Sequence, residues 1–323
     1  MARYRHSLPQ LAPIPFLTDG GLETTLIYHD GLELPEFAAF HLLRDAEGTL
    51  ALQRYFRRYA DIAVQHRTGL ILESATWRAS SDWGRRIGYT AADLVDVNRR
   101  AITMLEVIRA DIGTAETPVV ISGNIGPRGD GYVPDQLMSA EDAERYHRPQ
   151  ITTFASTVAD LVTAVTLNYT AEAIGIARAA RGVGMPVVLS FTVETDGRLP
   201  TGQSLAEAIA EVDAATENYP AYYMVNCAHP SHFAHLFSDE QPVWERIRGL
   251  RANASRKSHA ELNAATELDA GNPDEFGADY AALRAVMPWC TILGGCCGTD
   301  HRHIEAVAAQ SYHPWSRQPA GSR

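Results

Sequence analysis

The feature that most constrains the fold is a repeated alternation of short apolar runs with longer segments of helical periodicity. Runs typical of buried strands occur at 14–18, 69–73, 118–122, 161–166, 186–192, 221–226, 250–253 and 290–293. Helical spacing or capping-box starts predict helices at 49–66, 90–112, 139–158, 170–181, 204–218, 274–287 and 300–309. Near-continuously apolar strands that alternate with helices are typical of parallel sheets covered on both faces. Eight such strands predict an α/β protein with a closed (β/α)8 TIM barrel.

The alternation continues without a linker or low-complexity segment that would divide the chain. A length of 323 residues could hold two average domains or one large barrel. We therefore expect a single barrel domain over residues 1–310. Residues 311–323 are rich in Pro, Ser and Arg, and we expect them to form a loosely ordered C-terminal tail.

Charge and hydropathy argue against several classes of protein. The formal net charge is −11 and the basic residues are scattered, so we expect no nucleic-acid partner. No apolar stretch approaches the roughly 20 residues that span a bilayer, and the first ten residues lack the apolar core of a signal peptide. Four cysteines in so long a chain do not make a disulfide scaffold. We expect a cytoplasmic protein with no membrane partner, and its oligomeric state stays open.

Two adjacent cysteines, Cys296 and Cys297, lie between glycines directly after the last expected strand. Such a pair could form a strained disulfide, a redox couple or two corners of a metal site. Cys227 ends the expected sixth strand, so in a barrel its thiol lies on the same rim. Three thiolates without a fourth protein ligand are typical of an open, catalytic zinc site. Cys290, at the other end of the last strand, is interpreted as a packed core thiol.

The glycines beside the pair have a physical role in this hypothesis. Consecutive side chains of a strand diverge, so two neighbouring sulfurs reach one ion only with unusual backbone angles. Gly294, Gly295 and Gly298 are expected to permit those angles.

Two groups of histidines offer a rival metal site, and neither is interpreted as one. His229, His232 and His235 have helical spacing but lack the acidic base of the metalloprotease helix pattern. His301 and His303 open a helix instead of ending a strand.

An open position on a trithiolate zinc is poorly suited to making hydroxide, because three anionic sulfurs already neutralise the metal. It is better suited to binding a fourth thiol, lowering its pKa and presenting a thiolate near neutral pH. The residues therefore indicate alkyl transfer to sulfur.

With these motifs the chain resembles the zinc-dependent homocysteine S-methyltransferase family, which includes betaine-homocysteine and S-methylmethionine-dependent enzymes. The resemblance runs from Asp19-Gly20-Gly21 to the Gly-Gly-Cys-Cys-Gly segment at 294–298, with shorter matches at 76–80, 126–127, 147, 190–192, 226–227 and 253. It implies methyl transfer from a cationic donor, like S-methylmethionine, S-adenosylmethionine or betaine, to a zinc-activated thiol. With homocysteine as that thiol, the product is methionine.

The resemblance also implies the site residues. Zn²⁺ is expected on Cys227, Cys296 and Cys297, which with Asp19 form the catalytic group. Trp77 and Tyr132 are candidates for a ring-face contact with a cationic donor. The full set expected to bind substrate is Asp19, Gly20, Gly21, Thr76, Trp77, Tyr132, Ser190, Asn226 and Asn253. The expected partners are a small-molecule thiol and a cationic methyl donor.

Two positions depart from the family pattern. Val165 stands where the family usually carries a glutamate that helps to hold the substrate's amino group. An ammonium left against valine would be costly, so Asp19, Glu73 or Glu194 takes over, or the acceptor is another thiol or a selenol. Glu23 lies where the family commonly has glycine. A non-catalytic barrel with a metal- or redox-sensing thiol site is the alternative to an enzyme.

Overall fold

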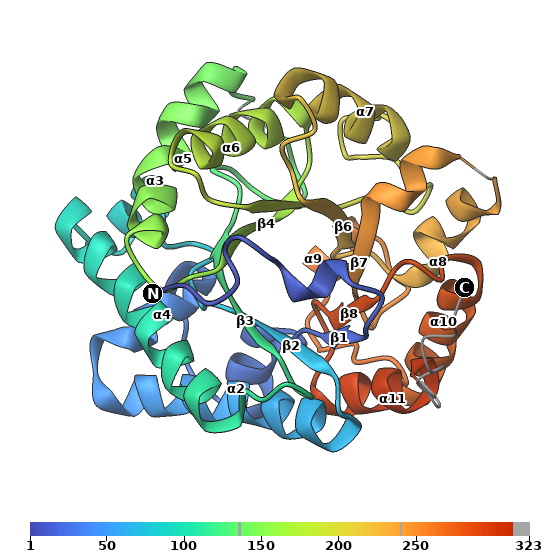
Figure 1. The fold of residues 1–323 in the computed structure, drawn as a ribbon, viewed down its shortest axis with the longest axis horizontal. Coiled ribbons are helices and arrows are strands. Elements are labelled where there is room, and N and C mark those ends of the chain that lie inside the picture. The colour runs from blue at the N-terminus through green and yellow to red at the C-terminus, as the bar shows by residue number, and fades with distance from the viewer. Residues whose placement is uncertain (135–136, 240, 313–323) are drawn as a thin grey trace, which may run out of the picture.

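Eight parallel strands close into one barrel in the computed structural model, which describes residues 1–134, 137–239 and 241–312 (Figure 1). Each strand pairs with the next, and β1 pairs with β8 to close the ring. The predicted single-domain (β/α)8 TIM barrel is confirmed. The strands are β1 (Phe16–Leu17), β2 (Gly69–Glu73), β3 (Val119–Ile125), β4 (Leu161–Leu167), β5 (Val187–Phe191), β6 (Tyr222–Asn226), β7 (Ile247–Ala252) and β8 (Ile292–Gly295).

Helices form the outer layer around the strands (Figure 1). The longer ones are α2 (Ala46–His66), α4 (Ala91–Ile112), α5 (Ala140–Ala155), α6 (Thr170–Gly182), α7 (Leu205–Thr216), α10 (Pro273–Val286) and α11 (His301–Ser311). Short helices lie in the loops: α1 (Leu22–Thr24), α3 (Ser81–Arg86), α8 (Pro230–Phe233) and α9 (His259–Asn263). The capping boxes expected at the starts of α4 and α7 are both formed, which fixes these helix starts where the sequence predicts them.

The limits of several expected elements differ from the observed ones; β3 and α5, for example, end at Ile125 and Ala155 instead of 122 and 158. The first strand is only two residues long, because prolines at 13 and 15 cannot donate to a ladder. β7 begins at Ile247, before the expected start at 250. β8 starts at Ile292 because Cys290 closes a turn, donating its amide to the carbonyl oxygen of Met287.

The inside of the barrel is a packed core at its amino-terminal end. The apolar side chains that fill it are Phe16, Ile71, Val120, Leu161, Val188, Tyr222, Met224 and Ile292. The N-terminal segment, dark blue in Figure 1, crosses this end of the barrel and packs Tyr4, Leu8 and Ile14 against the core. The amides of Arg3 and Tyr4 donate to Asp160 Oδ1 at 2.7 Å each. This end is therefore closed, and ligand access is left to the carboxyl ends of the strands.

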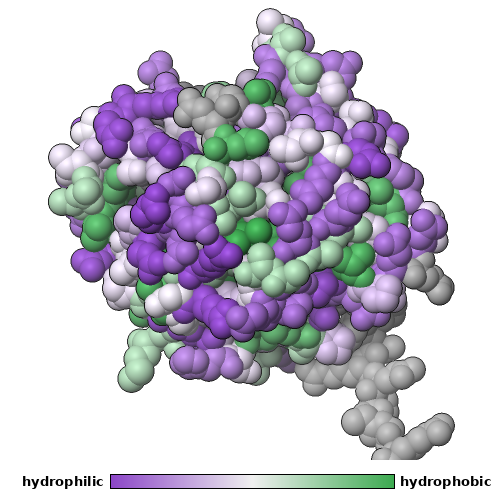
Figure 2. All heavy atoms as spheres, turned by 90° about the horizontal axis from the view of Figure 1, so that it is seen from above, coloured by the Kyte–Doolittle hydropathy of each residue, from purple (hydrophilic) through white to green (hydrophobic). Residues whose placement is uncertain are grey.

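The outer surface is mixed. On the face in Figure 2, hydrophilic residues predominate and hydrophobic ones are scattered among them. No helix within the described ranges is long and apolar enough to cross a membrane.

The last described residues close the seam between the first and last strands. Ser311 ends α11, and the Tyr312 hydroxyl lies 3.1 Å and 3.0 Å from the carbonyl oxygens of Phe16 and Thr291. Residues 313–323, most of the tail expected from residue 311, lie outside the described residues.

Candidate active site

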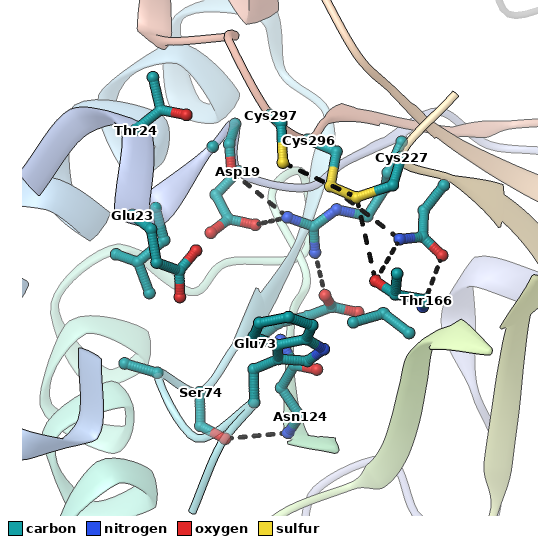
Figure 3. Close-up of a pocket in the computed structure, with 18 of the residues that line it drawn as sticks. Asp19, Glu23, Thr24, Glu73, Ser74, Asn124, Thr166, Cys227, Cys296 and Cys297 are labelled. Atoms are coloured by element: carbon teal, nitrogen blue, oxygen red, sulfur yellow. Dashed lines mark hydrogen bonds and ion pairs between the residues drawn. A yellow bond between two sulfur atoms is a disulfide. The ribbon is translucent and has the colours of Figure 1, made fainter. Parts of the chain in front are cut away.

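Three cysteines meet at the carboxyl end of the barrel. Cys227 directly follows β6, Cys296 and Cys297 follow β8, and the three sulfurs lie within 4.8 Å of one another. Cys227 and Cys296 are joined as a disulfide, whereas Cys297 is free, with its Sγ 3.9 Å from Cys227 Sγ (Figure 3). Cys290 is buried before β8, and burial raises the pKa of its thiol to about 12. The structure thus gathers the three expected thiols and leaves the fourth in the core.

The backbone is unusual where the thiols leave the strands. Cys227 has φ 55°, a left-handed conformation that costs a non-glycine residue on the order of 1–3 kcal/mol. Gly298 has φ 80°, as expected for a glycine that supplies an unusual angle. Gly294 and Gly295 do not have positive φ. They are needed for space, because a Cβ at either would collide with a neighbouring threonine hydroxyl.

Each sulfur has a polar neighbour that can donate to it. Thr166 Oγ1 and Asn226 Nδ2 each lie 3.9 Å from one sulfur of the disulfide pair, Cys227 and Cys296 respectively. The Tyr132 hydroxyl lies 3.5 Å from the free sulfur of residue 297. Burial raises the pKa of that thiol and the Tyr132 hydrogen bond opposes the shift. Donors placed in this way stabilise thiolates, as the outer shell of a metal site does.

Asn226 connects the thiols to the barrel wall. Its Oδ1 accepts from the Thr166 amide at 2.9 Å and from Ser190 Oγ at 2.6 Å, and its Nδ2 donates to Thr166 Oγ1 at 2.9 Å. Asn253 Nδ2 donates to the carbonyl oxygen of Cys227 at 3.0 Å. Ser190 and Asn253, which the sequence placed among the substrate-binding residues, are therefore buried behind the thiols and do not line the pocket.

A pocket opens beside the sulfurs (Figure 3). Thr76 lies outside it, since its hydroxyl contacts Ser74 Oγ at 2.7 Å and donates to the carbonyl oxygen of Asn124 at 2.8 Å. The other expected substrate-binding residues border the pocket. Its lining includes Asp19, Gly20, Gly21, Glu23, Glu73, Trp77, Asn124, Tyr132, Val165, Thr166, Asn226, Arg251 and the three cysteines.

A buried ion cluster forms one wall of the pocket. Arg251 of β7 donates from Nη2 to Asp19 Oδ1 at 2.6 Å, from Nη1 to the Glu73 carboxylate, and from Nε to the carbonyl oxygen of Gly295 at 3.1 Å. Tyr55 donates to Asp19 Oδ2 at 2.9 Å. Burial raises the pKa of Asp19 and of Glu73, and the guanidinium opposes both shifts. The cluster occupies both carboxylates with a cation that belongs to the protein.

Sequence reasoning missed Arg251. A signal was present, because Arg251 is a charged residue in a strand whose other neighbours, Leu250 and Ala252, are apolar. Such a residue is expected to be paired when the strand lies in a closed barrel.

The remaining acidic residues near the site divide into two kinds. Glu23 of α1 borders the pocket and its carboxylate points into it (Figure 3). Burial raises the pKa of Glu23 to about 7. Glu194 lies outside the pocket, where its Oε1 is 3.3 Å from His259 Nδ1. Val165 presents an apolar side chain to the same pocket.

Comparison with known proteins identifies the family. The sequence model of the homocysteine S-methyltransferase family matches residues 16–311. The chain belongs to this family. The family consists of S-methyltransferases, which confirms the expected class of enzyme. Membership also implies a small-molecule thiol and a methyl donor as substrates.

Two solved structures of a homocysteine methyltransferase share the fold. The chain is similar to MmuM from Escherichia coli in its oxidised form, with 19% identity, a TM-score of 0.70, and coverage of 96% of this chain and 100% of that chain. For the metallated form of MmuM the identity is 18% and the TM-score 0.70, with coverage of 95% and 99%. The whole barrel is therefore common to these proteins.

The separation of Cys227 Sγ and Cys297 Sγ fits a zinc site, whereas the Cys227–Cys296 disulfide would have to be reduced first. Zinc–sulfur bonds of about 2.3 Å in a tetrahedral site separate two sulfurs by about 3.8 Å. Cys227 Sγ and Cys297 Sγ are 3.9 Å apart. Within residues 1–134, 137–239 and 241–312, no other group of three or more His, Cys, Asp or Glu side chains is arranged to hold an ion. His229 instead caps α8, and His301 and His303 open α11.

Proposed function

We propose that this protein is a zinc-dependent S-methyltransferase of the cytoplasm that methylates homocysteine and so contributes to methionine biosynthesis. The observation that carries the proposal is the convergence of three cysteine sulfurs from β6 and β8 on one rim of the barrel, beside a pocket with acidic and aromatic walls. The proposal includes a cytoplasmic location because the zinc site needs reduced cysteines, and the cytoplasm keeps thiols reduced.

Cys227, Cys296 and Cys297 are the residues that would hold zinc, once the Cys227–Cys296 disulfide is reduced by two electrons to two thiolates. When bound, zinc lowers the pKa of a thiol in its open position, so that the thiol is ionised near neutral pH. The donors on Thr166, Asn226 and Tyr132 would hold the three sulfurs in orientation.

The reaction is a displacement at carbon. The substrate's thiol loses its proton to solvent, and its sulfur forms a bond to the methyl carbon of a sulfonium or quaternary ammonium donor. The bond from that carbon to the donor's sulfur or nitrogen breaks, and its electron pair neutralises the donor's charge. Trp77 and Tyr132 border the pocket, where their rings can contact a methylated cation.

The test is zinc content followed by methyl transfer. The protein is reduced, loaded with zinc and incubated with homocysteine and each of S-methylmethionine, betaine and S-adenosylmethionine, and methionine is quantified by mass spectrometry. We expect about one zinc per chain and methionine from at least one donor. A fully reduced protein that binds no zinc would point to the redox-sensing alternative.

Val165 favours a second candidate, the same chemistry on another thiol or a selenol. An apolar side chain lines the pocket where the family's carboxylate would face an ammonium. A panel of thiols and selenols, assayed with the same donors, separates the two candidates. Methylation of a panel member in the absence of any methionine formation would select the second.

A further inference from the structure

Four acidic residues are candidates to bind a cationic substrate, and three are excluded by their contacts or their position. Asp19 and Glu73 are both bound to the Arg251 guanidinium. Glu194 does not border the pocket and lies beside His259. Glu23 is the carboxylate that remains.

We propose that Glu23 is the specificity-determining residue that binds the cationic group of a substrate, either the ammonium of the thiol amino acid or the onium centre of the methyl donor. The proposal rests on the proposed function and names the side chain that replaces the family glutamate absent at Val165.

The position of Glu23 is fixed by contacts with the cysteine-bearing loop. Thr24 Oγ1 accepts from the Gly298 amide at 3.0 Å, and the Gly21 amide donates to the carbonyl oxygen of Thr299 at 3.1 Å. The residues on both sides of Glu23 are thus tied to the loop that follows β8. The backbone of Glu23 is therefore anchored to the loop that carries Cys297, and its carboxylate points into the pocket (Figure 3).

No partner is bound to the Glu23 carboxylate among the described residues, for which the structure contains neither an ion pair nor a side-chain hydrogen bond to it. Arg78 acts on Glu23 through its charge, but its direct contacts are with other groups. Its guanidinium lies over the Trp77 ring at 4.8 Å and the Trp83 ring at 3.7 Å, and its Nη1 donates to the carbonyl oxygen of Glu36 at 2.6 Å. A cationic ligand would therefore meet a carboxylate that no cation of the described residues contacts directly, although Arg78 and Arg251 act on it at longer range.

Neighbouring acceptors and charges favour a cation at this place. Asn124 Oδ1, also on the pocket wall, is buried and unpartnered in the described structure. Among the charged groups that act on Glu23, Asp19 raises its pKa and Arg78 and Arg251 lower it, while burial makes the largest contribution. A bound cation would offset that burial, as the family glutamate does for an amino group from another strand.

The test compares ligands that differ only in charge, on reduced, zinc-loaded protein. Choline and its neutral analogue 3,3-dimethylbutan-1-ol form one pair, and homocysteine and 4-mercaptobutanoate, which lacks the ammonium, form the other. Affinities are measured by calorimetry for the unchanged protein, for Glu23→Gln and for Glu47→Gln, a matched exposed position on α2. We expect a preference of about tenfold or more for the cation in at least one pair. Glu23→Gln should abolish that preference and Glu47→Gln should retain it.

The two pairs distinguish the sources of the charge. Loss confined to the homocysteine pair assigns Glu23 to the thiol's ammonium, and loss confined to the choline pair assigns it to the donor. An unchanged preference in Glu23→Gln, or no preference in the unchanged protein, overturns the proposal. If choline binding depends on Glu23 but homocysteine neither binds nor is methylated, the cation site stands and the homocysteine assignment fails. Circular dichroism and zinc content verify that each variant is folded and loaded.

Discussion

Single residues determine the chemical state of the site through their immediate neighbours. Each of the three cysteine sulfurs at the rim has one polar donor beside it, and the disulfide leaves Cys297 as the free thiol among these three. The carboxylates differ in the same way, because Asp19 and Glu73 contact a guanidinium and Glu23 does not. Cysteines, and likewise carboxylates, thus differ in chemical state within one pocket according to the groups that contact them.

Replacing one cysteine at a time tests the ligand assignment. Cys227→Ser, Cys296→Ser and Cys297→Ser should each lower the zinc content from about one per chain to nearly none, because two thiolates rarely retain the ion. Zinc is measured by plasma mass spectrometry after dialysis. Cys290→Ser is the control and should keep its zinc. A zinc-replete Cys227→Ser protein would contradict the assignment.

The pKa of Glu23 predicts a pH-dependent stability difference. Burial raises this pKa from 4.5 to about 7, so the folded state holds a proton that the unfolded state releases between these values. Glu23 therefore costs stability that is absent below the unfolded pKa and fully present above pH 7. Glu23→Gln removes that cost.

Urea unfolding of ligand-free protein measures this effect. Glu23→Gln should be more stable than the unchanged protein by about 1–3 kcal/mol at pH 8, and the difference should shrink on acidification and vanish at about pH 4, below the unfolded pKa. A difference of the same size at both pH values would show that packing, and not ionisation, is responsible.

At the scale of elements, the site is built from the loops after the strands and tied together by one strand residue. Arg251 of β7 contacts Asp19 after β1, Glu73 at the end of β2, and Gly295 at the end of β8. Arg251 therefore connects strands that are distant in sequence, at the pocket wall formed by the ion cluster.

Arg251→Met should destabilise the protein by about 3–5 kcal/mol, because it leaves two buried carboxylates without a cation. Chemical denaturation at pH 7 provides the measurement. Arg248→Met on the same strand is the control, since the Arg248 guanidinium donates to the carbonyl oxygen of Leu11 near the surface, and its cost should stay near 1 kcal/mol. An equal loss of unfolding free energy in both variants would mean that the ion cluster contributes no more to stability than the surface contact of Arg248.

At the scale of the whole molecule, the proposed metal site is coupled to the fold. The three cysteines of this site directly follow β6 and β8, which are separated in the barrel by β7. The residue after the last helix, Tyr312, contacts β1. An ion held by both strands binds only when the barrel is closed.

Zinc should therefore stabilise the reduced protein against unfolding. At a free zinc concentration 100-fold above Kd, the expected gain is about 2.7 kcal/mol, seen as a rise in Tm by calorimetry. Cys297→Ser, matched in fold but lacking one ligand, should show little rise. An equal rise in both proteins would indicate that zinc binds elsewhere.

The sequence by itself determined the architecture and the meeting of three cysteines on one rim of the barrel. Apolar runs alternating with capped helices specify a parallel barrel, and in such a barrel strand ends share one rim, so Cys227 and the 296–297 pair could be brought together without coordinates. Strand limits were less predictable, because prolines shorten β1 and a turn at Cys290 shifts β8.

Only the tertiary structure decided which side chains face the pocket and which of them are already paired. Ser190 and Asn253 lie behind the thiols and Arg251 binds Asp19 and Glu73, whereas Glu23 borders the pocket without an ion-pair partner among the described residues. These contacts join residues up to 232 positions apart. Local periodicity carries no information about such contacts, because they depend on the direction of each side chain once the barrel has closed.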